Sequence, residues 1–289
     1  MQPLVKKSAK REQVTSLTSN EKLSIKYHDI FDYPMTLGEL VKWRAQDKLS
    51  KINVDRITID SQNGLYFLKG RSGLMLKRSV RKRASSKKMK IAQKAVKLLS
   101  KIPTVRMVGV TGALAMENAT EESDIDLLII CSKGSLWTTR MLSWLILKAT
   151  GRKIRKPMDK KEKDKLCLNM WLDESDLVWR KRNIFTAHEI AQTIPLIDKG
   201  GYYKTFLGKN KWIKEYWPNA VNVPYNAVIT DNISGIGYIL YSLVKLVEPI
   251  LFRFQKNYMK GKITKEIIKP TRAVFHPNDL SLIVLSRLR

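Results

Sequence analysis

The sequence predicts an α+β protein in which a small mixed sheet lies between two regions that are mainly helical. Two short apolar runs, residues 105–110 and 124–131, have the character of β-strands and are separated by a glycine turn and a short helical segment. Longer segments such as residues 135–150 repeat apolar residues every three or four positions, which is typical of helices. The hydrophobic content of 44% is ordinary for a globular protein. These patterns place the sheet in the middle of the chain.

A chain of 289 residues is longer than one average domain, so two or three packed units are expected. We expect a disordered tail over residues 1–20, which are mainly polar, and a first folded unit over residues 21–84. The sheet is expected within residues 85–180, and a helical region within residues 181–289.

The cysteines and the amino terminus predict a cytoplasmic protein. Cys131 and Cys167 are the only cysteines, and they lie in apolar runs without the spacing of metal ligands, which favours free thiols in a reducing compartment. The amino terminus lacks the apolar core of a secretory signal. The most apolar stretch, residues 236–254, is interrupted by charges, Lys245 and Glu248 among them, so no membrane span is predicted.

Residues 21–84 are predicted to form a winged-helix-like unit. A first helical pattern is followed by a second helix, whose start is marked by Thr36 and Glu39 in the spacing of a capping box. The pair Asn63-Gly64 between two strand-like runs predicts a tight hairpin. Such units bind nucleic acid or serve as protein contacts, and the few basic residues on the expected second or third helix favour the protein contact.

Much of the net charge of +28 lies upstream of the expected sheet. Residues 51–100 contain fourteen Lys and Arg but only two Asp, and most of these cations lie on a long helix expected over residues 69–100. A cationic surface attracts polyanions without sequence specificity. The stretch from Arg71 to Lys97 is therefore a candidate nucleic-acid site, and a merely solvated basic face is an equal alternative.

Two acidic residues in the middle of the chain have a spacing that suits metal chemistry. On a strand, Asp124 and Asp126 project to one face about 6–7 Å apart, and Ile125 and Leu127 project to the other. The earlier turn at Gly112 allows close approach of a phosphate, and the helix after it offers free N–H groups to an anion. Paired carboxylates beside a phosphate site suit magnesium-dependent phosphoryl transfer, although a strand that opens on two solvated acids has the same pattern.

With this arrangement, the segment resembles the nucleotidyltransferase domain of the DNA polymerase beta superfamily. The superfamily motif is a hydrophobic residue, Gly, and then Gly or Ser, followed later by Asp-x-Asp in a strand. Thr111, Gly112 and Ala113 stand at the first three positions in this chain, and the run from Asp124 to Asp126 supplies the acidic pair.

The resemblance implies transfer of a nucleoside monophosphate from a nucleoside triphosphate such as ATP to an acceptor, with release of pyrophosphate. It implies that Asp124 and Asp126 hold Mg²⁺ as catalytic residues, and that Gly112, Ala113 and Ser123 bind the nucleotide.

In this superfamily the third strand commonly carries a third carboxylate, and residues 166–172 are the expected third strand here. Simple alternation places Cys167, Asn169 and Trp171 on one face, with Asp173 about 13 Å beyond Asn169. We therefore take Asn169 as the third catalytic-site residue. A neutral amide can coordinate magnesium but cannot accept a proton at neutral pH, which predicts weak catalysis or a base from elsewhere.

Two functions of other classes stay open. One is a nucleic-acid-binding regulator whose transferase domain is vestigial, with the basic helix as its working surface. The other is an adaptor that docks through its carboxy-terminal apolar helices. Turnover of a triphosphate separates the enzyme from both, and salt-dependent binding of nucleic acid separates the regulator from the adaptor.

Overall fold

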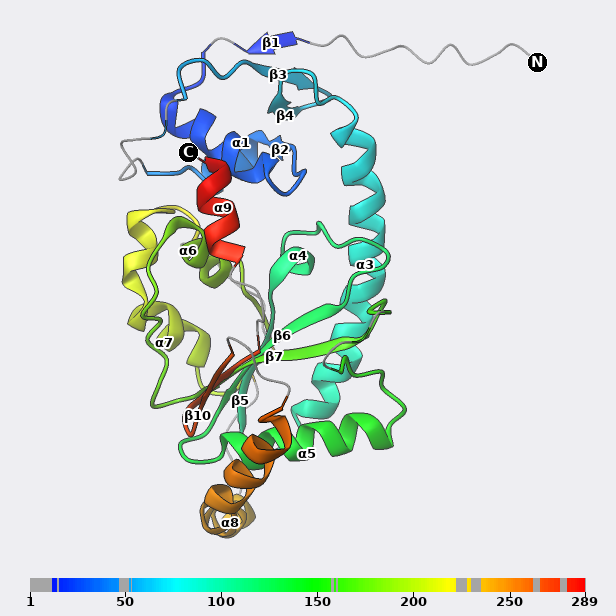
Figure 1. The fold of residues 1–289 in the computed structure, drawn as a ribbon, viewed down its shortest axis with the longest axis vertical. Helices are drawn as coiled ribbons and strands as arrows, with labels where there is room; N and C mark the ends of the chain where they lie inside the picture. The colour runs from blue at the N-terminus through cyan, green and yellow to red at the C-terminus, as the bar shows by residue number, and fades with distance from the viewer. Residues whose placement is uncertain are drawn as a thin grey trace, which may run out of the picture.

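The computed structural model describes residues 12–14, 16–46, 52, 54–156, 159, 161–221, 228–229, 235–261, 266–275 and 280–288. They form an α+β molecule, as the sequence predicts, and it contains two sheets (Figure 1). The smaller sheet has the strand order β1-β3-β4-β2, and the larger has the order β10-β11-β7-β6-β5-β8-β9.

The amino-terminal unit begins with two capped helices. Helix α1 (Ser19–Asp29) is followed by the short strand β2 (Met35–Thr36) and helix α2 (Leu37–Lys42). The capping box that the sequence predicts at α2 is confirmed. The Glu39 carboxylate accepts a hydrogen bond from the Thr36 N–H at 2.8 Å, and the Thr36 hydroxyl accepts one from the Glu39 N–H at 3.3 Å.

The predicted hairpin is also confirmed. Strands β3 (Ile59–Gln62) and β4 (Leu65–Leu68) pair antiparallel, and the two turn residues Asn63 and Gly64 have φ angles of 53° and 72°. Both values lie in the left-handed region that a two-residue turn of this kind requires. Between α2 and β3 the described residues contain no third helix, so the winged-helix assignment stays a prediction.

The amino-terminal tail differs from expectation within residues 1–20. Strand β1 (Glu12–Val14) pairs with β3, and α1 already begins at Ser19, where Thr18 forms a second capping box with Glu21. A polar composition predicts disorder. The outer edge of β3, however, has unpaired N–H and C=O groups, and β1 forms hydrogen bonds with them.

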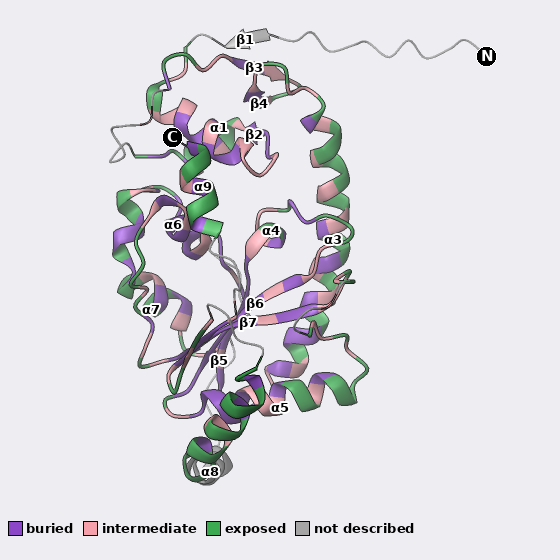
Figure 2. Cartoon of the chain, in the orientation of Figure 1, coloured by how far each residue is buried: buried purple, intermediate pink, exposed green. Residues whose placement is uncertain are grey.

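Helix α3 (Leu74–Leu99) connects the two sheets (Figure 1). Its inner face carries small and apolar side chains, Ala92, Ala95 and Leu99 among them, and these pack against the larger sheet. Figure 2 shows the exposed residues along the rest of the helix in green.

The centre of the larger sheet is formed by the three strands that the sequence predicts. Strand β5 (Val105–Val110) leads through helix α4 (Gly112–Ala115) to β6 (Ile125–Cys131), and the two strands pair antiparallel. Helix α5 (Leu136–Ala149) then crosses over to β7 (Leu166–Asp173), which pairs with β6 in parallel.

Both faces of these strands are covered. Leu128 and Ile130 of β6 belong to a hydrophobic cluster with the amino-terminal unit and α6. Leu127 and Ile129 belong to a second cluster with α3 and α5. Figure 2 accordingly shows β5 almost entirely in the buried colour. Because β6 is covered on both sides, most of its side chains past Asp126 are apolar.

The carboxy-terminal region contains strands as well as the helices that the sequence predicts. Helix α6 (Ile184–Ala191) and helix α7 (Tyr202–Lys209) enclose strand β8 (Ile194–Asp198), which pairs with β5. A 3₁₀ helix (Lys211–Glu215) follows. Further strands add to the sheet, namely β9 (Val228–Ile229), β10 (Ile267–Lys269) and β11 (Arg272–Val274). The sheet therefore extends past residue 180. Strands of two to five residues show little periodicity, so their pairing depends on the edges of β5 and β7.

Helix α8 (Gly235–Met259) contains Pro249 and packs on α5, and α9 (Leu280–Leu288) lies beside α1 and α6. The charge that interrupts the apolar pattern at Glu248 has a structural reason. Its carboxylate accepts hydrogen bonds from the Trp137 and Thr138 N–H groups at 2.7 and 2.8 Å, at the start of α5. Among the described residues, no helix is long and apolar enough to cross a membrane.

Candidate functional site

The structure brings the Gly112 turn and the Asp126 carboxylate together. Asp126 is the second residue of β6, and its backbone C=O accepts a hydrogen bond from the Thr111 N–H at 3.1 Å. Gly112 has a φ of +60°, and a Cβ on it would lie 2.7 Å from Oδ2 of Asp126. Only glycine therefore fits at this position without displacing the carboxylate.

Asn169 of β7 lies against the same carboxylate. Its Nδ2 donates a hydrogen bond of 2.6 Å to Oδ1 of Asp126, and its backbone C=O accepts one from the Phe275 N–H at 2.8 Å. The side chain is buried, and its Oδ1 has no hydrogen-bond partner. A buried acceptor without a donor is unfavourable in a protein interior, and it is a place where a ligand or ion gains a contact.

Cys167 and Asn169 both lie against Asp126, but the prediction that Trp171 shares their face is wrong. Asp126 pairs with Cys167 and Leu128 pairs with Met170, so β7 has one extra residue between the two pairs. This β-bulge places Trp171 in the cluster with α3 and α5, on the opposite face from Asp126. The Trp171 indole N–H donates to the Leu168 C=O at 2.9 Å, a carbonyl within the bulge.

The structure keeps Asp173 away from the other candidates. It pairs with Cys131 at the far end of the two strands. Its Oδ2 accepts a hydrogen bond from the Gly134 N–H at 2.6 Å, and its Oδ1 accepts from the Ser175 N–H at 2.8 Å and from the Ser175 hydroxyl at 2.6 Å. These bonds hold the turns after β6 and β7.

Asp124 lies just before β6, and one ligand atom each from Asp124, Asp126 and Cys167 lie within 4.8 Å of one another. Burial and the neighbouring Asp124 charge raise the pKa of Asp126 to about 7. Burial also raises the pKa of the Cys167 thiol above its usual range. The region thus favours an added positive charge.

These donors fit a hard divalent cation. Two carboxylates, together with the unpaired amide oxygen of Asn169, are the oxygen ligands that magnesium prefers. The Cys167 thiol is soft and holds its proton, so it is a poor magnesium ligand.

The other predicted nucleotide-binding residues lie nearby in sequence but are less distinctive. Ala113 is exposed on α4, which covers only residues 112–115. The Ser123 hydroxyl donates to the Thr120 C=O at 3.0 Å, within the loop before Asp124.

Lys88 of α3 holds this loop, and sequence reasoning missed it. The ammonium donates to the backbone C=O groups of Glu121 and Ser123 at 3.0 and 2.8 Å, and it forms a 2.7 Å ion pair with Asp164. Lys88 is buried. The signal in the sequence is the spacing of three and four residues that places Lys88 on the same face of the helix as the small, buried residues Ser85 and Ala92.

Two further charged residues near the site have no signal in the sequence. Arg155, in the loop between α5 and β7, places its Nη1 at 2.7 Å from Oδ2 of Asp124. Glu189 of α6 accepts a hydrogen bond from the Gln192 amide at 2.5 Å, and burial together with the Asp126 charge raises its pKa to about 8.

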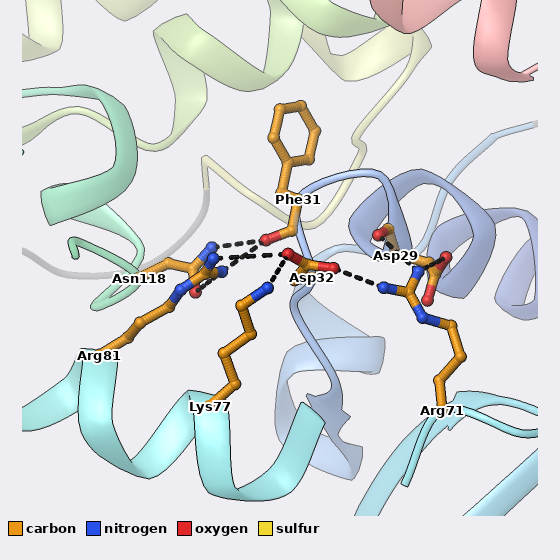
Figure 3. Close-up of polar contacts among 7 residues, drawn as sticks. All are labelled: Asp29, Phe31, Asp32, Arg71, Lys77, Arg81 and Asn118. Carbon is orange, nitrogen blue, oxygen red and sulfur yellow. Dashed lines mark hydrogen bonds and ion pairs between the residues drawn. The ribbon is translucent and has the colours of Figure 1, made fainter. Parts of the chain in front are cut away.

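Several cations of the predicted basic stretch bind the amino-terminal unit (Figure 3). Arg71 forms ion pairs with Asp29 and Asp32, and Lys77 pairs with Asp32 as well. Arg81 donates to the Phe31 C=O at 2.9 Å and to the Asn118 amide oxygen at 3.1 Å. Arg78 pairs with Glu39 at 2.7 Å. These side chains are not part of a free basic surface.

Neither a protein-family model nor a curated protein sequence matches the chain. A crystal structure of a toxin-antitoxin with AMP-PNP is similar to it at 12% identity, with 42% of this chain and 89% of that chain covered and a TM-score of 0.27. A mutant of the toxin-antitoxin MntA-HpeT is similar at 11% identity, with 42% and 87% covered and a TM-score of 0.26.

Proposed function

We propose that this chain is a magnesium-dependent nucleotidyltransferase that transfers a nucleoside monophosphate from a triphosphate to an acceptor. The observation that carries the proposal is the contact between the Asp126 carboxylate and the Gly112 turn, with Asp124 beside it. Paired carboxylates suit a metal ion, and a glycine turn beside them allows a phosphate to approach the backbone closely.

In this reaction the acceptor oxygen forms a bond to the α-phosphorus, and the bond from that phosphorus to the bridging oxygen breaks as pyrophosphate leaves. Asp124 and Asp126 would hold magnesium, which neutralises the phosphates and lowers the pKa of the attacking hydroxyl. Gly112 and Ala113 would direct backbone N–H groups to the triphosphate. The Asn169 amide orients Asp126 and cannot take the proton of the acceptor hydroxyl, which would pass to solvent water, so slow transfer is expected.

Calorimetry with magnesium and a non-hydrolysable triphosphate analogue tests this function, together with a transfer screen that uses labelled triphosphates and a panel of acceptors. We expect binding that needs both the nucleotide and the metal and that is lost in Asp126→Ala. Circular dichroism of the variant verifies that the fold survives. Equal affinity in the wild type and in this variant, with and without the metal, would contradict the proposal.

A second candidate function, binding of nucleic acid, rests on the outer cations of α3, which are Arg83, Lys87, Lys90, Lys94 and Lys97. They are exposed and recur every three or four residues along one side of the helix. Among the described residues, none forms an ion pair with them. They face away from the sheet, and their regular spacing along the helix suits the phosphates of a polyanion.

The salt dependence of nucleic-acid binding tests the outer cations. Replacement of Lys87, Lys90 and Lys94 by Gln should flatten the slope of the logarithm of affinity against the logarithm of salt by up to about three phosphate equivalents. Arg81 is unsuitable for this experiment because its guanidinium binds Phe31 and Asn118. An unchanged slope would mean that this face is only solvated.

A further inference from the structure

The side chain of Arg155 lies among the candidate metal ligands of the proposed site, the cluster of Asp124, Asp126 and Cys167. Its Nη1 lies 2.7 Å from Oδ2 of Asp124 and 3.8 Å from the Cys167 sulfur, so it contacts two of the three groups of that cluster. Among the described residues, it is the one cation in contact with Asp124. The guanidinium supplies the positive charge that the two carboxylates favour.

The backbone on which Arg155 lies is held in place. The Arg155 N–H donates to the Leu166 C=O at 2.9 Å, and the Leu166 N–H donates to the Lys153 C=O at 2.8 Å. Ile154 forms a parallel bridge with Leu166 at the start of β7. This main chain fixes the Arg155 Cα beside Asp124, so any rearrangement is confined to the side chain.

The side chain also has a second partner outside the cluster. Nη2 of Arg155 forms an ion pair with Glu162, whose side chain is about as exposed as that of Arg155, 33% against 34%. Asp124 is much less exposed, at 10%. The guanidinium therefore contacts two carboxylates, that of Asp124 at the site, which is largely shielded from solvent, and that of Glu162, which is in contact with solvent.

We infer that Arg155 is a built-in counter-ion of Asp124 that a divalent cation must displace, and that Glu162 receives the displaced guanidinium. This inference rests on the proposed function, because it needs Asp124 to be a metal ligand. Two cations a few ångströms apart in a partly buried site repel each other strongly. A metal at Asp124 is therefore incompatible with the guanidinium position in this structure, and Arg155 sets the metal concentration at which the site fills.

A titration with Mn²⁺, followed by the loss of the electron paramagnetic resonance signal of the free ion, measures this competition directly and needs no turnover. Arg155→Gln should bind Mn²⁺ roughly tenfold more tightly than the wild type, since the competing charge is gone. Arg155→Lys, which keeps the charge, should stay near the wild type. Glu162→Gln should bind more weakly, because the displaced guanidinium loses its second partner.

The matched control is Lys153→Gln, which removes one positive charge from the same loop at an exposed side chain with no ion pair among the described residues. Its affinity should equal that of the wild type. Equal or weaker Mn²⁺ binding in Arg155→Gln would overturn the inference and leave the proposed function intact, provided that the wild type binds and Asp124→Asn does not. An absence of Mn²⁺ binding in every variant would overturn both.

Discussion

The two ends of the strand pair β6–β7 each carry a carboxylate, that of Asp126 partly buried and that of Asp173 fully buried, and the surroundings of these carboxylates differ. Asp173 accepts hydrogen bonds from two backbone N–H groups and one hydroxyl, which satisfy both of its oxygens. Asp126 accepts hydrogen bonds from the Asn169 amide and the Cys167 thiol but from no backbone N–H among the described residues, lies beside the charge of Asp124, and has a raised pKa. A carboxylate whose oxygens all accept hydrogen bonds stabilises a turn. A carboxylate that is repelled by a neighbouring negative charge is stabilised when a cation binds.

Removal of either carboxylate of the acidic pair should have the largest effect. Asp124→Ala and Asp126→Ala should each weaken magnesium-dependent triphosphate binding by roughly a hundredfold or more, because each removes a charged metal ligand. Calorimetry measures the loss. Asp173→Ala is the comparison variant, and it should bind the triphosphate within about twofold of the wild type. A large loss of binding in Asp173→Ala would erase the distinction between the two ends.

Asp173→Ala should instead affect stability. The Gly134 and Ser175 N–H groups would lose their acceptor, which should lower the free energy of unfolding by about 1–3 kcal/mol. Urea unfolding followed by tryptophan fluorescence measures the change. Ser175→Ala, which removes only the hydroxyl donor, should cost less. If Asp173→Ala unfolds at the same urea concentration as the wild type, the carboxylate does not hold these turns.

The raised pKa of Asp126 predicts a pH dependence of metal binding. Below about pH 7 this carboxyl is protonated in the metal-free protein, so a metal must displace a proton to bind. Affinity for Mn²⁺ should therefore fall by up to about tenfold from pH 7 to pH 6 and should level off above pH 8. Asp173→Asn should show the same profile as the wild type. A flat profile between pH 6 and pH 8 would contradict the assignment.

The same shift has a consequence for stability of the opposite sign. Because the folded state binds this proton more tightly than the unfolded state does, the contribution of Asp126 to stability is fully present below about pH 4 and is lost as the pH rises through 7. Asp126→Asn removes the charge, so its melting temperature relative to the wild type should be higher at pH 8 than at pH 5. The opposite trend would mean that the folded protein does not destabilise the charged form of the Asp126 carboxylate.

The smallest effect is expected at Asn169. Asn169→Asp adds a third carboxylate beside Asp126 and removes the amide that binds it, so the melting temperature without metal should fall. Mn²⁺ should restore the melting temperature, and the affinity for Mn²⁺ or the transfer rate should increase several-fold. Asn169→Ala is the control, since it removes the amide without adding charge. An unchanged response to metal in Asn169→Asp, together with a loss of transfer in Asp173→Ala, would show that Asp173 is the third ligand.

The features that the sequence alone determined are those whose cause is local. The Thr36 capping box, the turn at Asn63-Gly64 and the strand Val105–Val110 each depend on residues within a few positions of one another. The pairing of a glycine turn with an Asp-x-Asp strand is also short in range. Such patterns are readable because the backbone conformation and the side-chain alternation follow directly from residue type.

Tertiary structure alone decided which charges meet. The sequence assigns Lys88, Arg81 and the outer cations of α3 to one basic stretch, but Lys88 is buried at the loop before Asp124 and Arg81 binds the amino-terminal unit. The bulge that places Asn169 against Asp126, and the contact of Arg155 with Asp124, join residues 43 and 31 positions apart. A charged side chain has no fixed partner in an extended chain, because its pairing is set by burial and by the elements that fold around it.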